Sequence, residues 1–228
     1  MQERTRHWLN SRGITDATIA SFNISEVEHP IMGPGAIQIP VNNPDGTFSF
    51  NKYRRDPFSE GTGAKYMYDK GGKTALFGAD VLERDTQLTL QNVVVTEGEL
   101  DTLVLDSMNI AAVSSTGGAM SFQEEFAHDL QYYPTYLCFD NDAAGAKGMV
   151  KTLQYLPDAK IILLPQLPDC KDITDYIKRG GDFHALMRSA KSYASLEEVQ
   201  EDKAVRKGQM LQTTFHDAYI EAHTPKPL

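Results

Sequence analysis

Two short segments of the chain pass from a run of apolar residues directly to acidic ones. Residues 93–95 are three valines followed by TEGELD, and residues 136–139, YLCF, are followed by DND. A continuous apolar run of this length predicts a strand that is buried on both faces, as in a parallel sheet. The acids then lie at the carboxyl ends of the strands, where open α/β sheets bind ligands. We therefore expect Glu97, Asp140 and Asp142 to approach one another.

Strand-like and helix-like patterns alternate between residues 92 and 188. The strand-like runs VVVT, IAAVSS, TYLCF and AKIILLP are each followed by a segment with helical spacing or a helix-capping residue. Repeated β-α units with short connections predict a parallel, right-handed α/β arrangement. We predict a domain over residues 91–190 that consists of a four-stranded parallel sheet with flanking helices.

The segments on either side of this region have different patterns. Residues 2–22 have the spacing of short helices, and the runs 36–41 and 47–55 flank the turn-forming sequence NNPDG. Such a turn between two short runs predicts a β-hairpin. We predict a smaller mixed α+β domain over residues 1–90 and a polar linker or docking tail over residues 191–228.

Basic and aromatic residues are interleaved ahead of the acidic segments. Residues 52–55 read KYRR, and residues 65–73 combine three lysines with two tyrosines. Alternation along a strand places Lys52 and Arg54 on one face and the tyrosine between them on the other. Bases and aromatic rings in such a pattern can bind a phosphate backbone and stack on nucleobases, although a solvated hairpin surface has the same pattern.

Composition and charge exclude several classes of protein. The chain has 228 residues, of which 41% are hydrophobic and 23% charged, as in an ordinary globular protein. It has no apolar run near the roughly 20 residues of a membrane span, and its polar start does not resemble a signal peptide, so we expect a cytoplasmic protein. Its net charge of −9 argues against a protein that coats nucleic acid non-specifically. Its two cysteines are too few for a zinc ribbon or a disulfide framework.

The three acids at the predicted sheet edge suit a divalent metal ion. Carboxylates that lie close together repel one another unless protons or cations neutralise them. Asp140 and Asp142 are two residues apart on an extended segment, so both side chains point the same way. Hard oxygen ligands favour Mg²⁺ or Mn²⁺. We expect a metal site formed with Glu97, and the alternative is a solvated acidic edge. Asp101, four residues later, lies within reach at the start of the following helix.

Three motifs resemble a known family. EGELD, FDNDAAG and CKDITDYI, in this order, resemble the Toprim domain that primases, topoisomerases and some nucleases share. The resemblance is closest to bacterial and phage primases, in particular the primase half of phage primase–helicases. It extends upstream through WLNSRGITDATIASF, IQIPV with FNKYRR, and KYMYDKGGKTALFG, so about residues 5–185 are covered. The two acidic motifs are specific together, whereas either alone would be weak.

The resemblance implies roles for individual residues. Glu97, Asp140 and Asp142 would be catalytic residues and ligands of Mg²⁺ or Mn²⁺, and Glu97 would be either a ligand or the general base. Asp101 and Asp172 would be further metal ligands, with helix capping as the alternative for Asp172. Nucleotide or DNA binding is implied for Lys52, Arg54, Arg55, Lys65, Lys73 and Lys171. Arg54 and Arg55 are alternatives for the same binding position, because they are adjacent and the sequence does not fix the register of the strand.

The function implied is that of a DNA primase core, a DNA-directed RNA polymerase and therefore a nucleotidyltransferase. It would synthesise short RNA primers from ribonucleoside triphosphates on single-stranded DNA during DNA replication, in the bacterial host cytoplasm if the chain is of phage origin. The sequence contains no GxxxxGK[ST] loop and no cysteine-rich zinc module. We therefore expect a replicative helicase and a separate zinc or template-reading module as partners.

Two other functions use the same motifs. A Toprim nuclease would use the acids to cleave a phosphodiester, and a non-catalytic Toprim module would bind DNA or a helicase without synthesis. The basic and aromatic segment ahead of the acids favours the primase. A topoisomerase is disfavoured, because no separate domain is left to carry a tyrosine nucleophile.

Overall fold

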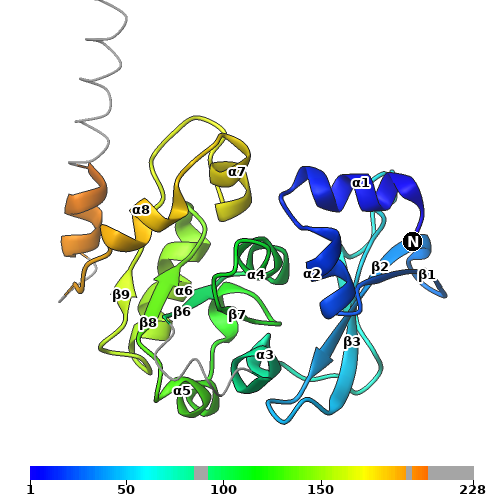
Figure 1. The fold of residues 1–228 in the computed structure, drawn as a ribbon, viewed down its shortest axis with the longest axis horizontal. Helices are drawn as coiled ribbons and strands as arrows, with labels where there is room; N and C mark the ends of the chain where they lie inside the picture. Colours follow the sequence, from blue (N-terminus) through cyan, green and yellow to red (C-terminus); the bar gives the residue numbers. More distant parts are fainter. Residues whose placement is uncertain (85–91, 194–196, 205–228) are drawn as a thin grey trace, which may run out of the picture.

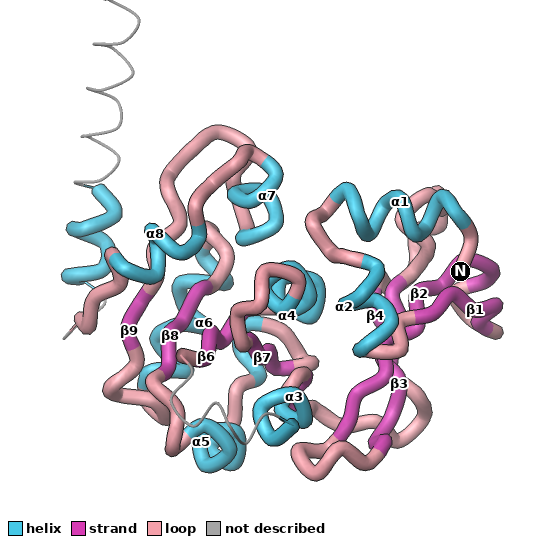
Figure 2. Tube along the Cα trace, viewed as in Figure 1, coloured by secondary structure: helices cyan, strands magenta, loops and turns pink. Residues whose placement is uncertain are grey.

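Two β-sheets organise the part of the chain described by the computed structural model, which is residues 1–84, 92–193 and 197–204 (Figures 1 and 2). The strand order is β1-β2-β3-β4 in the first sheet and β5-β7-β6-β8-β9 in the second. The predicted class, an α/β domain preceded by a smaller mixed α+β region, is confirmed.

The first sheet is an antiparallel meander. Its strands are β1 (Ser25–His29), β2 (Gly33–Asn42), β3 (Phe48–Arg54) and β4 (Tyr66–Tyr68). The predicted hairpin joins β2 to β3, and in its turn the backbone N–H of Thr47 donates to Oδ1 of Asp45 at 2.9 Å. Two helices, α1 (Glu3–Ser11) and α2 (Asp16–Ser21), precede this sheet.

The second sheet contains the four predicted parallel strands and one strand that was not predicted. The parallel strands are β6 (Val93–Thr96), β7 (Ala112–Ser115), β8 (Thr135–Cys138) and β9 (Lys160–Ile161). β6 lies between β7 and β8, and all four of its residues are buried, as expected for a strand covered on both faces. The additional strand, β5 (Leu76–Phe77), pairs antiparallel with β7 at the edge of the sheet. Two residues are too few to show a strand pattern in the sequence.

Helices cover both faces of the second sheet. They are α3 (Ala79–Arg84), α4 (Glu99–Asp106), the 3₁₀ helix η1 (Ala119–Ser121), α5 (Glu124–Leu130), α6 (Ala143–Leu153), α7 (Ile173–Lys178) and α8 (Phe183–Arg188). Residues 197–204 are also helical, and the rest of the predicted tail, apart from residues 191–193, lies outside the described residues. Over the described residues, no helix combines the length and the apolar character needed to cross a membrane.

The two halves of the chain share a hydrophobic core. Successive residues of β6 face opposite sides of the sheet. Val94 belongs to a cluster that includes Leu9 and Ile14 from the N-terminal helical region and Leu103 from α4. Val93 and Val95 belong to the cluster on the other face, which includes residues of α5 and α6. The N-terminal helices therefore pack on α4, and this contact holds the first sheet against the second.

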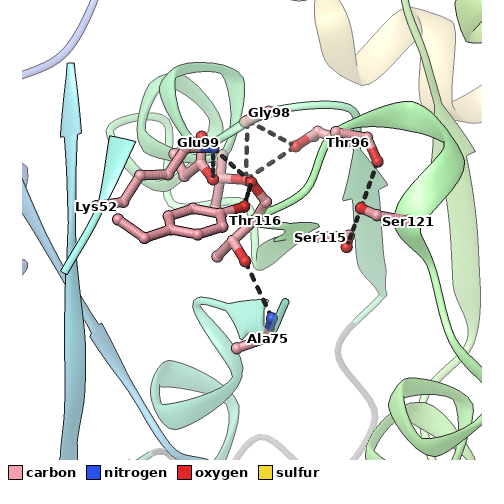
Figure 3. A network of polar contacts seen from close by, with 11 residues as sticks. Lys52, Ala75, Thr96, Gly98, Glu99, Ser115, Thr116 and Ser121 are labelled. Atoms are coloured by element: carbon pink, nitrogen blue, oxygen red, sulfur yellow. Dashed lines mark hydrogen bonds and ion pairs between the residues drawn. The ribbon is translucent and has the colours of Figure 1, made fainter. Parts of the chain in front are cut away.

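A buried ion pair joins the two sheets (Figure 3). Nζ of Lys52 on β3 lies 2.6 Å from Oε1 of Glu99, the first residue of α4, and donates to the carbonyl oxygen of Thr116 at 2.6 Å. The hydroxyl of Tyr68 donates to the same carbonyl at 2.6 Å, and the ring centroid of Tyr66 lies 4.7 Å from the ammonium. Lys52 is 6% exposed and Glu99 2% exposed. Burial raises the pKa of Glu99, and the ammonium opposes that rise, so each charge depends on the other.

We predict that Lys52→Met lowers the free energy of unfolding by about 3–5 kcal/mol, because the Glu99 carboxylate would be left buried without its partner. The double variant Lys52→Met/Glu99→Leu should recover most of that loss, since it leaves no unpaired charge. Unfolding in denaturant measures both effects. A Lys52→Met variant as stable as the wild type would show that the ion pair does not hold the sheets together.

Candidate active site

A cleft of about 580 Å³ lies between the first sheet and the carboxyl ends of the strands of the second. The second sheet and the residues after it supply acidic lining residues, Glu97, Glu99, Asp101, Asp140 and Asp172. Basic lining residues are Arg12, Lys52, Arg54, Lys65 and Lys171. A larger cleft of about 720 Å³ lies between the β2–β3 turn, residues 69–76 and α5, and among its described lining residues are none of the three acids predicted to be catalytic.

The pairing of β6 with β8 brings two predicted acids together. The strands run parallel, and Thr96 lies opposite Cys138, so both chains leave the sheet at the same edge. Glu97 follows at once, and its Oε2 accepts the backbone N–H of Asp140 at 3.4 Å. The structure thus places these two acids side by side.

The charge of these two acids is only partly neutralised. Burial, together with repulsion from Asp140, raises the pKa of Glu97 to about 7. Burial and repulsion from Asp172 raise the pKa of Asp140 to about 6. Burial is the larger cause of both shifts, and the neighbouring carboxylates add to it, since both effects disfavour the charged form. The edge of the sheet therefore favours the approach of a cation.

Asp142 is engaged by a helix and by a lysine. Its Oδ1 accepts the N–H groups of Ala144 and Gly145, each at 2.9 Å, and so caps the N-terminus of α6. Its Oδ2 lies 3.0 Å from Nζ of Lys171, which also lies 3.5 Å from Oδ2 of Asp140. The N–H of Gly145 and the Lys171 ammonium hold the pKa of Asp142 below its ordinary value. Lys171 thus lies between the two aspartates and supplies part of the missing positive charge.

Gly145 allows α6 to begin close to residues 140–142, the acidic loop between β8 and α6. A Cβ atom at this position would lie 2.2 Å from the carbonyl oxygen of Asp140, far closer than non-bonded atoms approach. Only a residue without a side chain fits there unless the backbone moves. The position of Asp140 therefore depends on glycine at residue 145.

The remaining two predicted ligands make structural contacts around α7. Asp101 is buried. Its Oδ1 accepts two hydrogen bonds from Thr174, one from the backbone N–H at 3.2 Å and one from the side-chain hydroxyl at 2.8 Å. Burial and repulsion from Asp172 raise the pKa of Asp101 to about 7. Oδ1 of Asp172 accepts the N–H of Asp175 at 2.7 Å, which is the capping role considered as the alternative, and its Oδ2 lies 3.8 Å from Arg12. These acids fix α7 beside the cleft, whatever further role they have.

The carboxylates of Glu97, Asp140 and Asp142 are suitable ligands for a hard divalent cation, but their side chains are not gathered around one point. Among the described residues, no three His, Cys, Asp or Glu side chains are grouped closely enough to hold a metal ion. Glu97 and Asp140 offer incompletely neutralised carboxylates, and Asp142 keeps Oδ2 free of the helix cap. Carboxylate oxygens are the ligands that Mg²⁺ takes. A bound cation would compete with Lys171 for the two aspartates.

Four of the six basic residues predicted to bind nucleotide or DNA line the cleft, namely Lys52, Arg54, Lys65 and Lys171. Arg54 rather than Arg55 faces it, because neighbouring residues of an extended strand point to opposite sides. Arg55 instead donates to the carbonyl oxygens of Gly61 and Ala64 in the following loop. Lys73 lines the larger cleft. The geometry therefore brings neither Arg55 nor Lys73 to the acids.

Arg12 is one of the basic residues that line the cleft, although we did not predict it. We call the side of the cleft formed by Arg12, Lys52, Arg54 and Lys65 the basic wall, and the side formed by the acidic lining residues the acidic wall. The guanidinium carbons of Arg12 and Arg54 lie 5.2 and 4.4 Å from the ring centroid of Trp8. Burial and the two guanidinium groups lower the pKa of Lys65. Within the described part of the chain, Nε of both arginines is buried without a hydrogen-bond partner. A cluster of cations such as this one favours an anionic ligand. Arg12 could not be singled out from the sequence, because a lone arginine after a helix has no distinctive pattern, although it lies in the segment WLNSRGITDATIASF that resembles primases.

Comparison with known proteins supports this description of the fold. A family model described as Toprim-like matches residues 94–177, and no curated protein matches the chain. The zinc-binding and RNA polymerase domains of Aquifex aeolicus primase superpose with a TM-score of 0.69 at 20% identity, over 90% of this chain and 61% of that one. The primase fragment of the bacteriophage T7 primase–helicase gives 0.60 at 23% identity, over 79% and 72%. The E. coli primase catalytic core gives 0.66 at 19% identity, over 86% and 75%.

These matches establish a domain and a fold. The family match runs from β6 to α7 and so contains the acidic loop. The structural matches include the preceding sheet as well, since they cover 79% to 90% of this chain, and this chain spans less than two thirds of the Aquifex one. Residues 94–177 are thus a Toprim-like domain, within a chain that has the fold of the catalytic cores of DNA primases.

Proposed function

We propose that the chain is the polymerase core of a DNA primase, which joins ribonucleotides into short primers on single-stranded DNA with Mg²⁺ or Mn²⁺. One observation carries the proposal: incompletely neutralised acids face a cluster of cations across a single cleft. Phosphoryl transfer depends on positioning and electrostatic stabilisation of a highly charged group. The acidic and basic residues that line the cleft are suited to both tasks.

The basic wall would hold the triphosphate of the incoming nucleotide. Arg12, Arg54 and Lys65 line the cleft together, and the Nε groups of the two arginines lack partners. A guanidinium group offers several donors in a plane and binds phosphate with two parallel hydrogen bonds. Trp8, in contact with both guanidinium groups, holds their orientation. A phosphate group in the cleft would compete with Asp172 for the Arg12 guanidinium group and add an acceptor for the basic residues around it.

The acidic wall would hold the metal. Glu97 and Asp140, which line the cleft, and Asp142, which lies beside Lys171, are the residues whose oxygens would bind it. When bound, the ion would neutralise charge that develops on the reacting phosphate. Lys171 is 59% exposed on its side chain, so its ammonium can turn from the aspartates towards a phosphate. Asp101 and Asp172 would keep α7 in place while this exchange occurs.

Template and partner proteins follow from the same proposal. Related structures include a DnaG primase catalytic domain bound to single-stranded DNA, and a complex of the bacteriophage T7 lagging-strand DNA polymerase with two primase domains, an RNA/DNA hybrid and dTTP. We infer a single-stranded DNA template and ribonucleoside triphosphates for this chain. The Aquifex structure contains a zinc-binding domain beside its polymerase domain. We infer that a separate zinc or template-reading module and a replicative helicase work with this chain.

Replacement of the acids tests the proposal. We expect Asp140→Asn and Glu97→Gln each to lower primer synthesis by at least about 100-fold, because several kcal/mol of transition-state stabilisation depend on the bound metal. The assay measures short products from labelled ribonucleotides on mixed-sequence single-stranded DNA with Mg²⁺ or Mn²⁺. Glu28→Gln is the matched control, since Glu28 is an exposed acid on β1.

Each other result in this assay has a definite meaning. Products that persist in both acid variants would contradict the assignment of the site. Acid-dependent shortening of the template, without primers, would replace the primase by a nuclease. Neither activity, with DNA binding retained in every variant, would replace it by a non-catalytic binding module.

Replacement of Arg12 tests the basic wall. We expect Arg12→Ala to raise the KM for ribonucleotides about 10- to 100-fold, because a charge-assisted hydrogen bond to phosphate contributes about 1.5–3 kcal/mol. Arg6→Ala is the matched control, since Arg6 has an exposed side chain and lies on α1, the helix that Arg12 follows. Steady-state kinetics measure KM, and a melting curve checks the fold. An Arg12→Ala variant with unchanged KM would remove Arg12 from the nucleotide site.

A further inference from the structure

The residue between the two predicted catalytic aspartates is held by four hydrogen bonds. The backbone N–H of Asn141 donates to the carbonyl oxygen of Lys171 at 2.7 Å, and its Nδ2 donates to the carbonyl oxygen of Pro165 at 3.3 Å. Its Oδ1 accepts from Nε2 of Gln166 and from Nζ of Lys203, the latter at 3.2 Å. Both polar ends of the Asn141 side chain are therefore bound.

Lys203 comes from a segment that we predicted to be a linker or tail. It lies 62 residues after Asn141, in the helix at residues 197–204, which is the orange segment beyond α8 in Figure 1. That helix is anchored independently of Lys203. Val199 is 4% exposed within the core of the second sheet, and Asp202 accepts from Nζ of Lys191 at 3.4 Å and from the hydroxyl of Tyr193.

The contact lies between the two acids in the chain. Asp140 and Asp142 flank Asn141, so the hydrogen bonds of Asn141 constrain the backbone from which both carboxylates project. A side-chain amide that is bound at both ends cannot rotate without breaking hydrogen bonds. Replacement of residues that orient metal ligands without touching the metal commonly lowers metal affinity about 10- to 100-fold. The Lys203 ammonium also adds positive charge on the side of the loop near Asp142.

We propose that Lys203 is a positioning residue of the active site, which acts through Asn141 to fix the loop that carries Asp140 and Asp142. The helix at residues 197–204 is then a working part of the site. The inference rests on the proposed function, because that function makes Asp140 and Asp142 ligands of a catalytic metal ion. Its test uses two readouts that do not depend on primer synthesis.

The first experiment compares three variants. Lys203→Met removes the ammonium and keeps the aliphatic stem, Lys203→Arg restores a cationic donor, and Lys178→Met is a control at an exposed lysine of α7. We expect Lys203→Met to weaken Mn²⁺ binding about 10-fold, measured by the paramagnetic resonance signal of the free ion. Hydrogen exchange at residues 140–145 should accelerate in the same variant. Lys203→Arg should restore most of both properties, and Lys178→Met should match the wild type.

A second comparison separates positioning from folding. We expect the melting temperature of Lys203→Met to fall by less than about 4 °C, since the helix keeps its other anchors. In primer synthesis, kcat should fall while the KM for ribonucleotides stays constant. Asn141→Ala alone and Asn141→Ala/Lys203→Met should weaken Mn²⁺ binding equally, because Lys203 acts through Asn141.

The results that would overturn the proposal are distinct from those that would overturn the primase function. Wild-type Mn²⁺ affinity and wild-type hydrogen exchange in Lys203→Met would refute the positioning role even if the chain makes primers. Additive effects of the Asn141 and Lys203 replacements would refute the route through Asn141. A chain that makes no primers, but in which Lys203→Met loosens the loop and weakens Mn²⁺ binding, would refute the primase function alone.

Discussion

The ion pair between Lys52 and Glu99 determines how the two walls of the cleft face each other. Lys52 shares a strand face with Arg54, and Glu99 follows Glu97 by two residues, so the pair links the basic wall to the acidic one. Both charges are buried, and neither is stable there without the other. The contact therefore couples the stability of the fold to the width of the cleft.

The elements that the sequence predicts well are those encoded by local patterns. Apolar runs that end in acids at residues 93–99 and 136–142 indicate both the burial of two strands and the edge at which their acids meet. The sequence NNPDG likewise encodes the β2–β3 hairpin in its turn residues. The strand β5 has no such pattern, because it consists of two residues whose strand conformation depends on pairing with β7. Its existence follows from tertiary contacts alone.

The predicted site depends on long-range contacts in the same way. Composition and motif order place acids and bases near one another, but the partner of each charge is decided in space. Lys52 binds an acid 47 residues away, and Lys203 reaches an asparagine 62 residues away. Arg12 gains its place in the cleft from the end of α1 and its contact with Trp8. Sequence spacing cannot show these pairs, because nothing in the local chain records which distant residue will approach.

The position of β5 makes the Toprim-like domain dependent on the residues before it. Leu76 and Phe77 cover the outer edge of β7, a strand whose backbone groups would otherwise be exposed at that side. An uncovered strand edge readily pairs with another chain. A gene fusion or a truncation that begins the protein at β6 would thus produce a sheet prone to self-association. A protein in which this sheet lacks β5 would need another segment to cover the edge of β7.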